Sequence, residues 1–434
     1  MLQLDAERPA RSARDRGRIG LAVAGGGPIG GMWELGALHA LADSISGLDL
    51  TDLHVYVGVS SGAFLAAGLA NGLDTAEMAR IFLTGDSREA VFHPESFVRP
   101  AVFEYLQRAS GLPRMMLDWA GDMVRNPLNA RLSDAVFRIG SLLPTGLFDN
   151  ESVEAFLREI FTGPGRCNDF RELDHRLFLI AVELDSGQAV RLGGPGLEDV
   201  PISRAVAASA ALPGLYPPVK IAERWYVDGA LARTLHASAA LDQGATLVFA
   251  VNPLVPYHAD RAPDAGHVAP ESLIRDGLPA VLSQTFRTLL TSRMRTGLGK
   301  YAQSYPQADM LLFEPRADEV ELFFTNLFSY GHRRRVAELA WRVVRADLRR
   351  NAETLLPLLA RHGLALRHER LAETDRSLET SLRLHPARDA ATASLNAALN
   401  DLDGALRRRT TSASATPRST RRPDSGRRPS ATGR

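Results

Sequence analysis

Residues 19–43 read IGLAVAGGGPIGGMWELGALHALAD and decide the fold. An apolar run of strand length meets three glycines, and apolar residues then recur at helical spacing through Leu41. The pattern repeats in residues 54–72, HVYVGVSSGAFLAAGLANG, where Asn71 and Gly72 are typical of a helix end. Two successive strand, turn and helix units predict a parallel sheet with helices on both faces.

The same alternation continues along the chain. Further strands are expected at 177–184, 225–227, 246–251 and 310–314, and a helix at 150–161. The alternation covers about residues 18–345, which predicts an α/β fold. A charged, Leu-rich stretch follows, with Leu395, Leu399, Leu402 and Leu406 spaced for one helical face, and it predicts C-terminal helices.

Charge is distributed unevenly over the 434 residues. Residues 405–434 hold nine Arg and one Asp, a charge of +8, so −7 remains on residues 1–404 out of a net +1. This tail is rich in Ser, Pro and Arg without apolar periodicity, so we expect disorder. Contact of the tail with anionic lipid is one interpretation of its charge, a solvated linker is another, and no nucleic-acid partner is expected.

Targeting signals are not evident. No apolar run reaches the length of a transmembrane helix, and the first apolar stretch breaks at Gly25 before it could serve as a signal peptide. The single cysteine, Cys167, excludes internal disulfides. We therefore expect a cytoplasmic or peripherally membrane-associated protein.

Gly58-Val59-Ser60-Ser61-Gly62 matches the nucleophile elbow G-x-S-x-G between an expected strand and helix. In that turn the serine hydroxyl projects above the sheet, and the helix start directs its positive end at an anion formed there. Ser60 is the candidate nucleophile. Ser61, the next residue, is a candidate amide donor.

The glycine run 25–31 also lies between a strand and a helix. Amides of Gly25, Gly26 and Gly27 can converge on an oxyanion, whereas Pro28 has no N–H. The run also fits the dinucleotide pattern G-x-G-x-x-G, but that site needs an acidic residue where the next strand ends, and Ser60 stands there instead. Asp228, at the end of an expected strand, is the candidate base, since burial can raise a carboxyl pKa enough for it to accept the serine proton.

Four blocks, GGGPIGG, GVSSG, ALPGLYPPV and VDGA, together resemble the signature blocks of the patatin-like phospholipases, in order and in spacing. The resemblance implies a three-layer α/β/α fold and a lipid acyl hydrolase with a Ser60–Asp228 dyad. It also implies an oxyanion hole at Gly25, Gly26 and Gly27, to which we add the Ser61 amide. No cofactor or metal is required. Ile29 stands where related bacterial proteins often carry Arg or Lys, which leaves the head-group preference open.

The resemblance also divides the chain. It implies a catalytic domain at 18–348, preceded by a flexible leader (1–17) and followed by a helical extension (349–404) and the tail (405–434). The substrate is expected to be a phospholipid or lysophospholipid at a membrane or micelle surface. Residues 91–127 gather aromatic side chains in a stretch that the sheet does not require, so they are a candidate lid over the acyl site, although an ordinary helix contact explains them too.

Two alternatives stay open. A catalytically silent lipid-binding or scaffold protein could keep the same fold. A Ser-Asp-His esterase is also available in chain order, because histidines follow Asp228: His236, His258, His267 and His332. The oligomeric state is not predicted.

Overall fold

A computed structural model describes residues 2–4, 17–87, 90, 92, 99, 145–257, 272–275, 277–316 and 330–382. The chain divides into two compact units, Met1–Leu384 and His385–Arg434, and all described residues belong to the first. The predictions for the tail and for the helical face at Leu395 lie outside the described residues. So does the lid prediction, except at Phe92 and Arg99.

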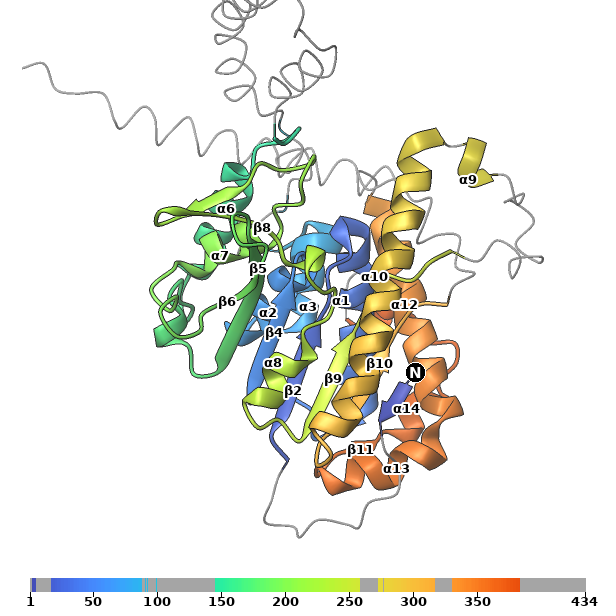
Figure 1. The fold of residues 1–434 in the computed structure, drawn as a ribbon. Helices are drawn as coiled ribbons and strands as arrows, with labels where there is room; N and C mark the ends of the chain where they lie inside the picture. The colour runs from blue at the N-terminus through green and yellow to red at the C-terminus, as the bar shows by residue number, and fades with distance from the viewer. Residues whose placement is uncertain are drawn as a thin grey trace, which may run out of the picture. The chain divides into compact units, whose positions relative to one another are not determined.

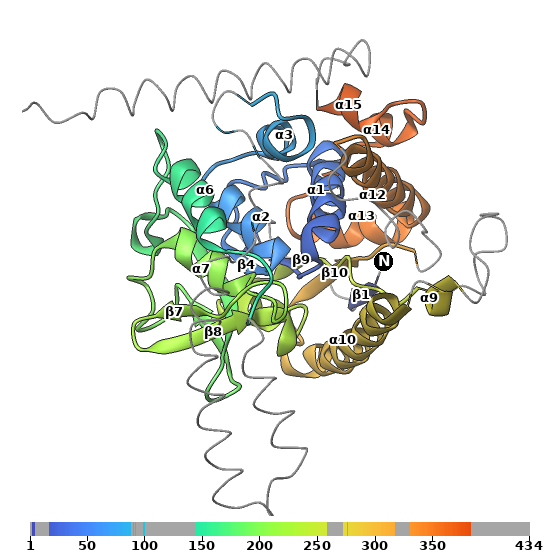
Figure 2. The same ribbon diagram turned by 90° about the horizontal axis from the view of Figure 1, so that it is seen from above.

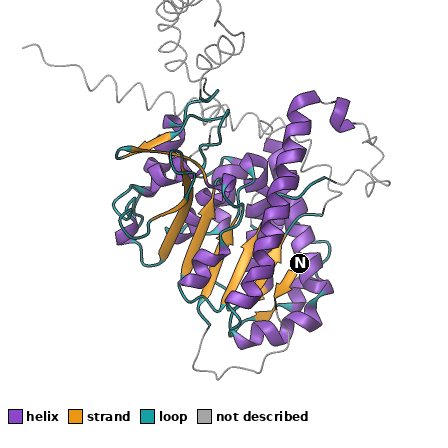
Figure 3. Ribbon diagram, viewed as in Figure 1, coloured by secondary structure: helices purple, strands orange, loops and turns teal. Residues whose placement is uncertain are grey.

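One mostly parallel sheet organises the described residues (Figures 1 and 3). Its strands run in the order β1-β10-β9-β2-β4-β5-β8-β7, and β6 pairs with β5. The strands are β1 (Leu2–Leu4), β2 (Ile19–Val23), β4 (Val55–Val59), β5 (Arg176–Glu183), β6 (Ala189–Leu192), β7 (Val219–Ile221), β8 (Arg224–Asp228), β9 (Leu247–Val251) and β10 (Asp309–Phe313). The five central strands from β10 to β5 are parallel, and the strands outside them pair antiparallel.

Helices cover both faces of this sheet (Figure 2). The described helices are α1 (Gly27–Ser44), α2 (Ser61–Ala70), α3 (Thr75–Ala79), a π-helical turn (Arg80–Thr84), α6 (Glu151–Phe161), α7 (Ile202–Ser209), α8 (Ala237–Asp242), α9 (Ser272–Arg275), α10 (Gly277–Ser304), α12 (Tyr330–Arg350), α13 (Ala352–Arg361), α14 (His368–Ala372) and α15 (Leu378–Ser381). The short turns Phe170–Glu172 and Gly229–Leu231 are 3₁₀ helices.

The side chains of each central strand point alternately to the two faces of the sheet, so the hydrophobic core consists of two clusters. In β2, Leu21 and Val23 join the core cluster under α1, α2 and α12, whereas Ala22 faces the cluster under α8 and α10. Successive side chains of a strand point to opposite faces, so each central strand supplies both clusters. The three-layer α/β/α architecture predicted from the sequence is confirmed.

A short edge strand lies within the stretch expected to be a leader, of which only residues 2–4 and 17 are described. Leu2–Leu4 form β1, which pairs antiparallel with β10, Leu2 opposite Leu312 and Leu4 opposite Met310. The alternating Leu-Gln-Leu sequence suits a strand, and the outer edge of β10 offers unpaired backbone groups that such a strand satisfies.

The region that follows α12 packs against the C-terminal end of α1. A two-residue strand β11 (Ala365–Leu366) pairs with β3 (Ile45–Ser46) at the end of α1. Arg345 on α12 forms a buried ion pair with Asp43 at 3.5 Å. None of the described helices combines the length and apolar composition needed to cross a bilayer.

Candidate active site

Ser60 stands between β4 and α2 in a strained conformation. Its φ of 52° and ψ of −120° are unusual for a residue with a side chain. A Cβ on Gly62 would lie 2.4 Å from the Ala24 carbonyl oxygen, which accepts a hydrogen bond from the Gly62 amide at 3.1 Å. Only glycine fits that contact, so the second glycine of the motif holds the tight turn that presents Ser60.

Ser209, at the end of α7, supports the turn. The Ser60 amide donates to Ser209 Oγ at 3.0 Å, and that hydroxyl donates to the Ile180 carbonyl at 2.6 Å. Both bonds are buried, so they tie the elbow to β5 and α7. Ser209 was not predictable from the sequence, because a single serine in an alanine-rich helix carries no distinguishing pattern.

Sheet register brings Asp228 to the same level as Ser60. Val59 of β4 pairs with Ile180 of β5, and the next β5 residue, Ala181, pairs with Asp228. The residue after Val59 therefore falls in one row with Asp228, although 168 positions separate them along the chain.

The Asp228 carboxylate is buried, with 1% of the residue exposed. It accepts a hydrogen bond from the Ala230 amide at 2.8 Å, and the Ser60 side chain lies close enough to influence its pKa. Burial raises the pKa of Asp228 to about 6, and the interactions with Ser60 and the Ala230 amide oppose this rise. A carboxylate with this pKa can exchange a proton with a serine more readily than an exposed aspartate.

The glycine run has a different role at each position. The Gly26 amide donates to Ser61 Oγ at 2.9 Å, and Ser61 Oγ donates to Glu34 Oε2 at 3.1 Å. Gly27, with a φ of +64°, and Ser61 both line the cavity beside Ser60, each at the first turn of a helix. The Gly26 amide is thus occupied, which leaves Gly27 and Ser61 as the cavity-lining members of the predicted oxyanion hole.

Glu34 is fully buried below this loop. Burial raises the pKa of Glu34 well above its ordinary value, opposed by the hydrogen bond from Ser61. Glu34 was not predictable as a site residue, because in the sequence it is one polar position in a mostly apolar helix.

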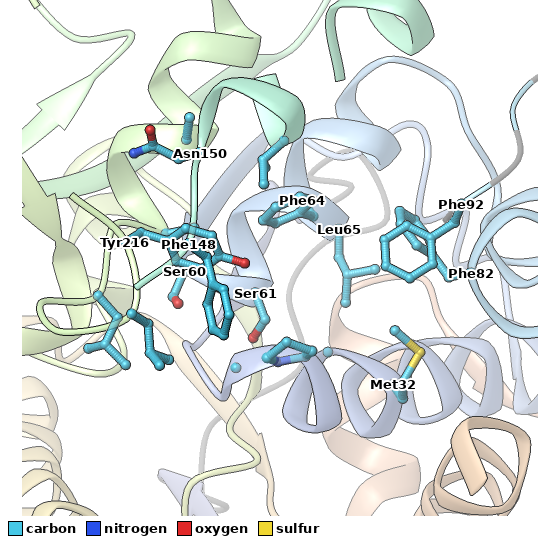
Figure 4. A pocket seen from close by; sticks show the side chains of 18 of the residues that line it. Met32, Ser60, Ser61, Phe64, Leu65, Phe82, Phe92, Phe148, Asn150 and Tyr216 are labelled. Carbon is cyan, nitrogen blue, oxygen red and sulfur yellow. The ribbon is translucent and has the colours of Figure 1, made fainter. Parts of the chain in front are cut away.

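An apolar cavity of about 360 Å³ opens at Ser60 (Figure 4). Phe148 and Tyr216 lie near the serine, and Phe82 and Phe92 lie at the other end. The wall comprises Gly27, Pro28, Gly31, Met32, Leu35, Ser60, Ser61, Phe64, Leu65, Phe82, Phe92, Phe148, Asn150, Val153, Ala207, Ala210, Leu212, Leu215 and Tyr216. Its composition suits a hydrocarbon chain with one end at the Ser60 hydroxyl.

Residues 21–241, from β2 into α8, match the family model of the patatin-like phospholipases. The chain belongs to this family. It is accordingly a lipid acyl hydrolase. No curated protein matches the chain significantly.

Solved structures give weaker similarities to this patatin-like chain. VipD from Legionella pneumophila is 13% identical with a TM-score of 0.30, over 85% of this chain and 90% of VipD. The type III effector protein ExoU is 17% identical with a TM-score of 0.32, over 90% of this chain and 64% of ExoU. In the complex of SpcU with ExoU from Pseudomonas aeruginosa, the matched chain is 14% identical with a TM-score of 0.26, over 68% of this chain and 54% of that chain. The chain therefore spans less than two thirds of ExoU.

Family blocks account for part of the cavity of this patatin-like chain. Leu212, Leu215 and Tyr216 come from the ALPGLYPPV block, so that signature supplies one wall. Ile29 packs half-buried against the hydrophobic core and is not part of the cavity wall. Phe92, the described aromatic of the candidate lid, packs edge to face on Phe82 with ring centroids 5.2 Å apart.

Among the described residues, no histidine hydrogen-bonds to Ser60 or Asp228. His236 is buried before α8, where burial lowers its pKa to about 4, and neither it nor His332 hydrogen-bonds to Ser60 or Asp228. His258 and His267 lie outside the described residues. Within the described part of the chain, no group of three or more His, Cys, Asp or Glu side chains is arranged to hold a metal ion.

Proposed function

We propose that Ser60 is the nucleophile and Asp228 the base of a hydrolase that cleaves one acyl ester of a phospholipid or lysophospholipid. One observation carries the proposal: Ser60 lines an apolar cavity, and the sheet register places it in one row with the buried Asp228 carboxylate, whose pKa its side chain influences. The absence of a histidine bond to either residue, among those described, favours a dyad over a Ser-Asp-His triad.

The reaction proceeds through two acyl transfers. Asp228 accepts the Ser60 proton while Oγ attacks the ester carbonyl, and Asp228 then returns the proton to the departing alcohol. A water molecule, deprotonated by the same carboxylate, releases the fatty acid from Ser60. Amides of Gly27 and Ser61 stabilise the oxyanion, aided by the positive ends of two helices. Gly25 packs close against Ser60, and Gly26 supports the loop through Ser61.

Fatty-acid release tests this proposal. The purified full-length chain is incubated with mixed vesicles of phospholipids, lysophospholipids and neutral glycerides, with Ser60→Ala as the blank, and the products are identified by mass spectrometry. We expect fatty acid and a deacylated phospholipid to accumulate only with wild type. If wild type releases nothing from any lipid or soluble ester, the catalytically silent lipid-binding protein becomes the better interpretation.

Ser61→Ala should reduce kcat on a soluble p-nitrophenyl ester about tenfold, with little change in KM. The change removes the acceptor of the Gly26 amide and the donor to Glu34, so the loop loses its anchor while the Ser61 amide remains. Glu34→Gln is the matched variant, because its amide oxygen can still accept the Ser61 hydrogen bond, and it should lose less. A loss as large as that of Ser60→Ala would contradict the supporting role of Ser61.

Removal of residues 405–434 should leave turnover of soluble esters unchanged and weaken binding to anionic vesicles. The removed segment carries +8 and is not part of the proposed chemistry. Initial rates on p-nitrophenyl butyrate and sedimentation with phosphatidylglycerol vesicles measure the two effects. A large loss on the soluble ester would show that the tail contributes to the site itself.

A further inference from the structure

Helix α10 has apolar residues on two opposite faces. Leu290, Met294, Leu298 and Tyr301 are buried, and the last three belong to the core cluster on the α8 side of the sheet. Large apolar residues at the N-terminal half are instead exposed: Leu278 (69%), Val281 (42%), Leu282 (57%) and Leu289 (54%). At about 100° per residue these four fall within a sector of about 100°, centred opposite the buried residues. We call them the α10 outer stripe.

The charged side chains of helix α10 itself are all positive. Residues 277–304 contain three Arg and one Lys and no Asp or Glu. Arg293, Arg295 and Lys300 are exposed along the C-terminal half of α10, whereas Arg287 is turned inward. An exposed apolar stripe with nearby cations and no acids is typical of a helix that lies in the interface of an anionic bilayer.

The outer stripe lies at the same end of the sheet as Ser60. Gln284 is bonded to the backbone of Tyr257, and Thr291 donates to the Leu254 carbonyl at 3.1 Å, so this half of α10 is fixed to the segment that follows β9. Because β9 and β4 run parallel, that segment and Ser60 both follow carboxyl ends of strands. Figure 1 shows the N-terminal half of α10 extending past this end of the sheet.

The cavity wall is also exposed at this end. Leu215, which lines the cavity, is 39% exposed, and Leu147, next to the cavity residue Phe148, is 48% exposed. The end of the sheet where the proposed ester cleavage occurs therefore carries two apolar surfaces, one beside the cavity and one on α10.

We propose that the α10 outer stripe is a docking surface for anionic lipid bilayers, with the four leucine and valine side chains entering the acyl boundary and the cations facing lipid phosphates. The functional role of this docking rests on the proposed lipid-ester hydrolysis, because docking would bring the cavity to its substrate. The binding itself does not depend on catalysis.

Vesicle binding tests the docking surface in the full-length chain with Ser60→Ala, which prevents lipid turnover. Leu278→Gln, Leu282→Gln and Leu289→Gln are combined, because Gln keeps helix propensity. The control combines Leu184→Gln and Leu356→Gln, exposed leucines on the β5–β6 turn and on α13 (50% and 39%). Cosedimentation uses phosphatidylcholine vesicles with and without phosphatidylglycerol, at low and high salt.

We expect the α10 variant to lose at least about tenfold in partition onto phosphatidylglycerol vesicles, and the control to bind as the parent does. With Ser60 restored, the α10 variant should turn over a soluble ester at the wild-type rate.

Equal partition of the α10 variant and the control would overturn the proposal. So would a dimer by light scattering that the α10 changes dissociate, because a second copy would then cover the stripe. Failure of the proposed chemistry is distinguishable, since it would abolish ester turnover and leave vesicle partition unchanged.

Discussion

Ser60→Ala is expected to lower kcat/KM on a soluble p-nitrophenyl ester by at least about 10³-fold. The change removes the only atom proposed to form a bond with the acyl carbon, so the two-step route through an acyl-enzyme is lost. The amides and the cavity remain, which leaves the small residual rate typical of serine hydrolases without their nucleophile. Initial rates with wild type and variant at equal concentration measure the effect.

Covalent labelling separates lost chemistry from lost structure. A fluorophosphonate should add one label to wild type, at Ser60, and none to Ser60→Ala. Ser61→Ala is the matched control: it removes a neighbouring hydroxyl and should keep the label. Alanine at position 60 must adopt the same positive φ as serine, and both residues carry a Cβ, so little change in thermal unfolding is expected. A Ser60→Ala protein with wild-type turnover would refute the nucleophile assignment.

The fold was largely predictable because its central strands are buried on both faces. β2, β4, β5, β8, β9 and β10 all coincide with apolar runs that end at glycine, asparagine or charged residues. The peripheral strands were harder to predict. β1 and β7 have three residues each, and such short runs carry too little periodicity to be distinguished from a coil. Their position depends on an edge that only the assembled sheet provides.

The candidate site was predictable where the backbone conformation requires a particular type of residue. Ser60 requires glycine two residues later, and Asp228 is followed by Gly229, whose Cβ would lie 2.2 Å from the Ile180 carbonyl oxygen. Contacts made across the fold leave no such signature. The bond between Gly26 and Ser61 depends on two helices meeting in space, which spacing along the chain does not encode.

Asp228→Asn is expected to lower kcat/KM by about 10³-fold or more on the same ester. Asparagine has nearly the shape of aspartate, and its amide oxygen can still accept the Ala230 hydrogen bond, but it cannot take the Ser60 proton. Fluorophosphonate labelling should slow in parallel, because it needs the same activated hydroxyl. Labelling and turnover at wild-type rates would show that another group removes the proton.

The pH dependence of wild type should report the same carboxylate. Asp228 must be ionised to act as a base, and its pKa lies at about 6. Below this pH, kcat/KM on a neutral ester should fall about tenfold per unit, and it should level off above it. Rates of Asp228→Asn should lack this acidic limb. An exposed aspartate would place the limb near 4, so a midpoint there would contradict the buried site.

Stability should change in the direction opposite to activity. The fold raises the pKa of Asp228 from 3.8 to about 6, so it favours the protonated form. The corresponding stability is present below pH 3.8 and is lost as the pH rises to about 6, which at pH 8 amounts to about 3 kcal/mol. Asparagine carries no charge to bury, so at pH 8 the inactive Asp228→Asn protein should unfold at an equal or higher temperature than wild type, and the difference should shrink toward pH 4. A lower melting temperature at pH 8 would mean that the carboxylate stabilises the fold, and that its burial is not the cause of the raised pKa.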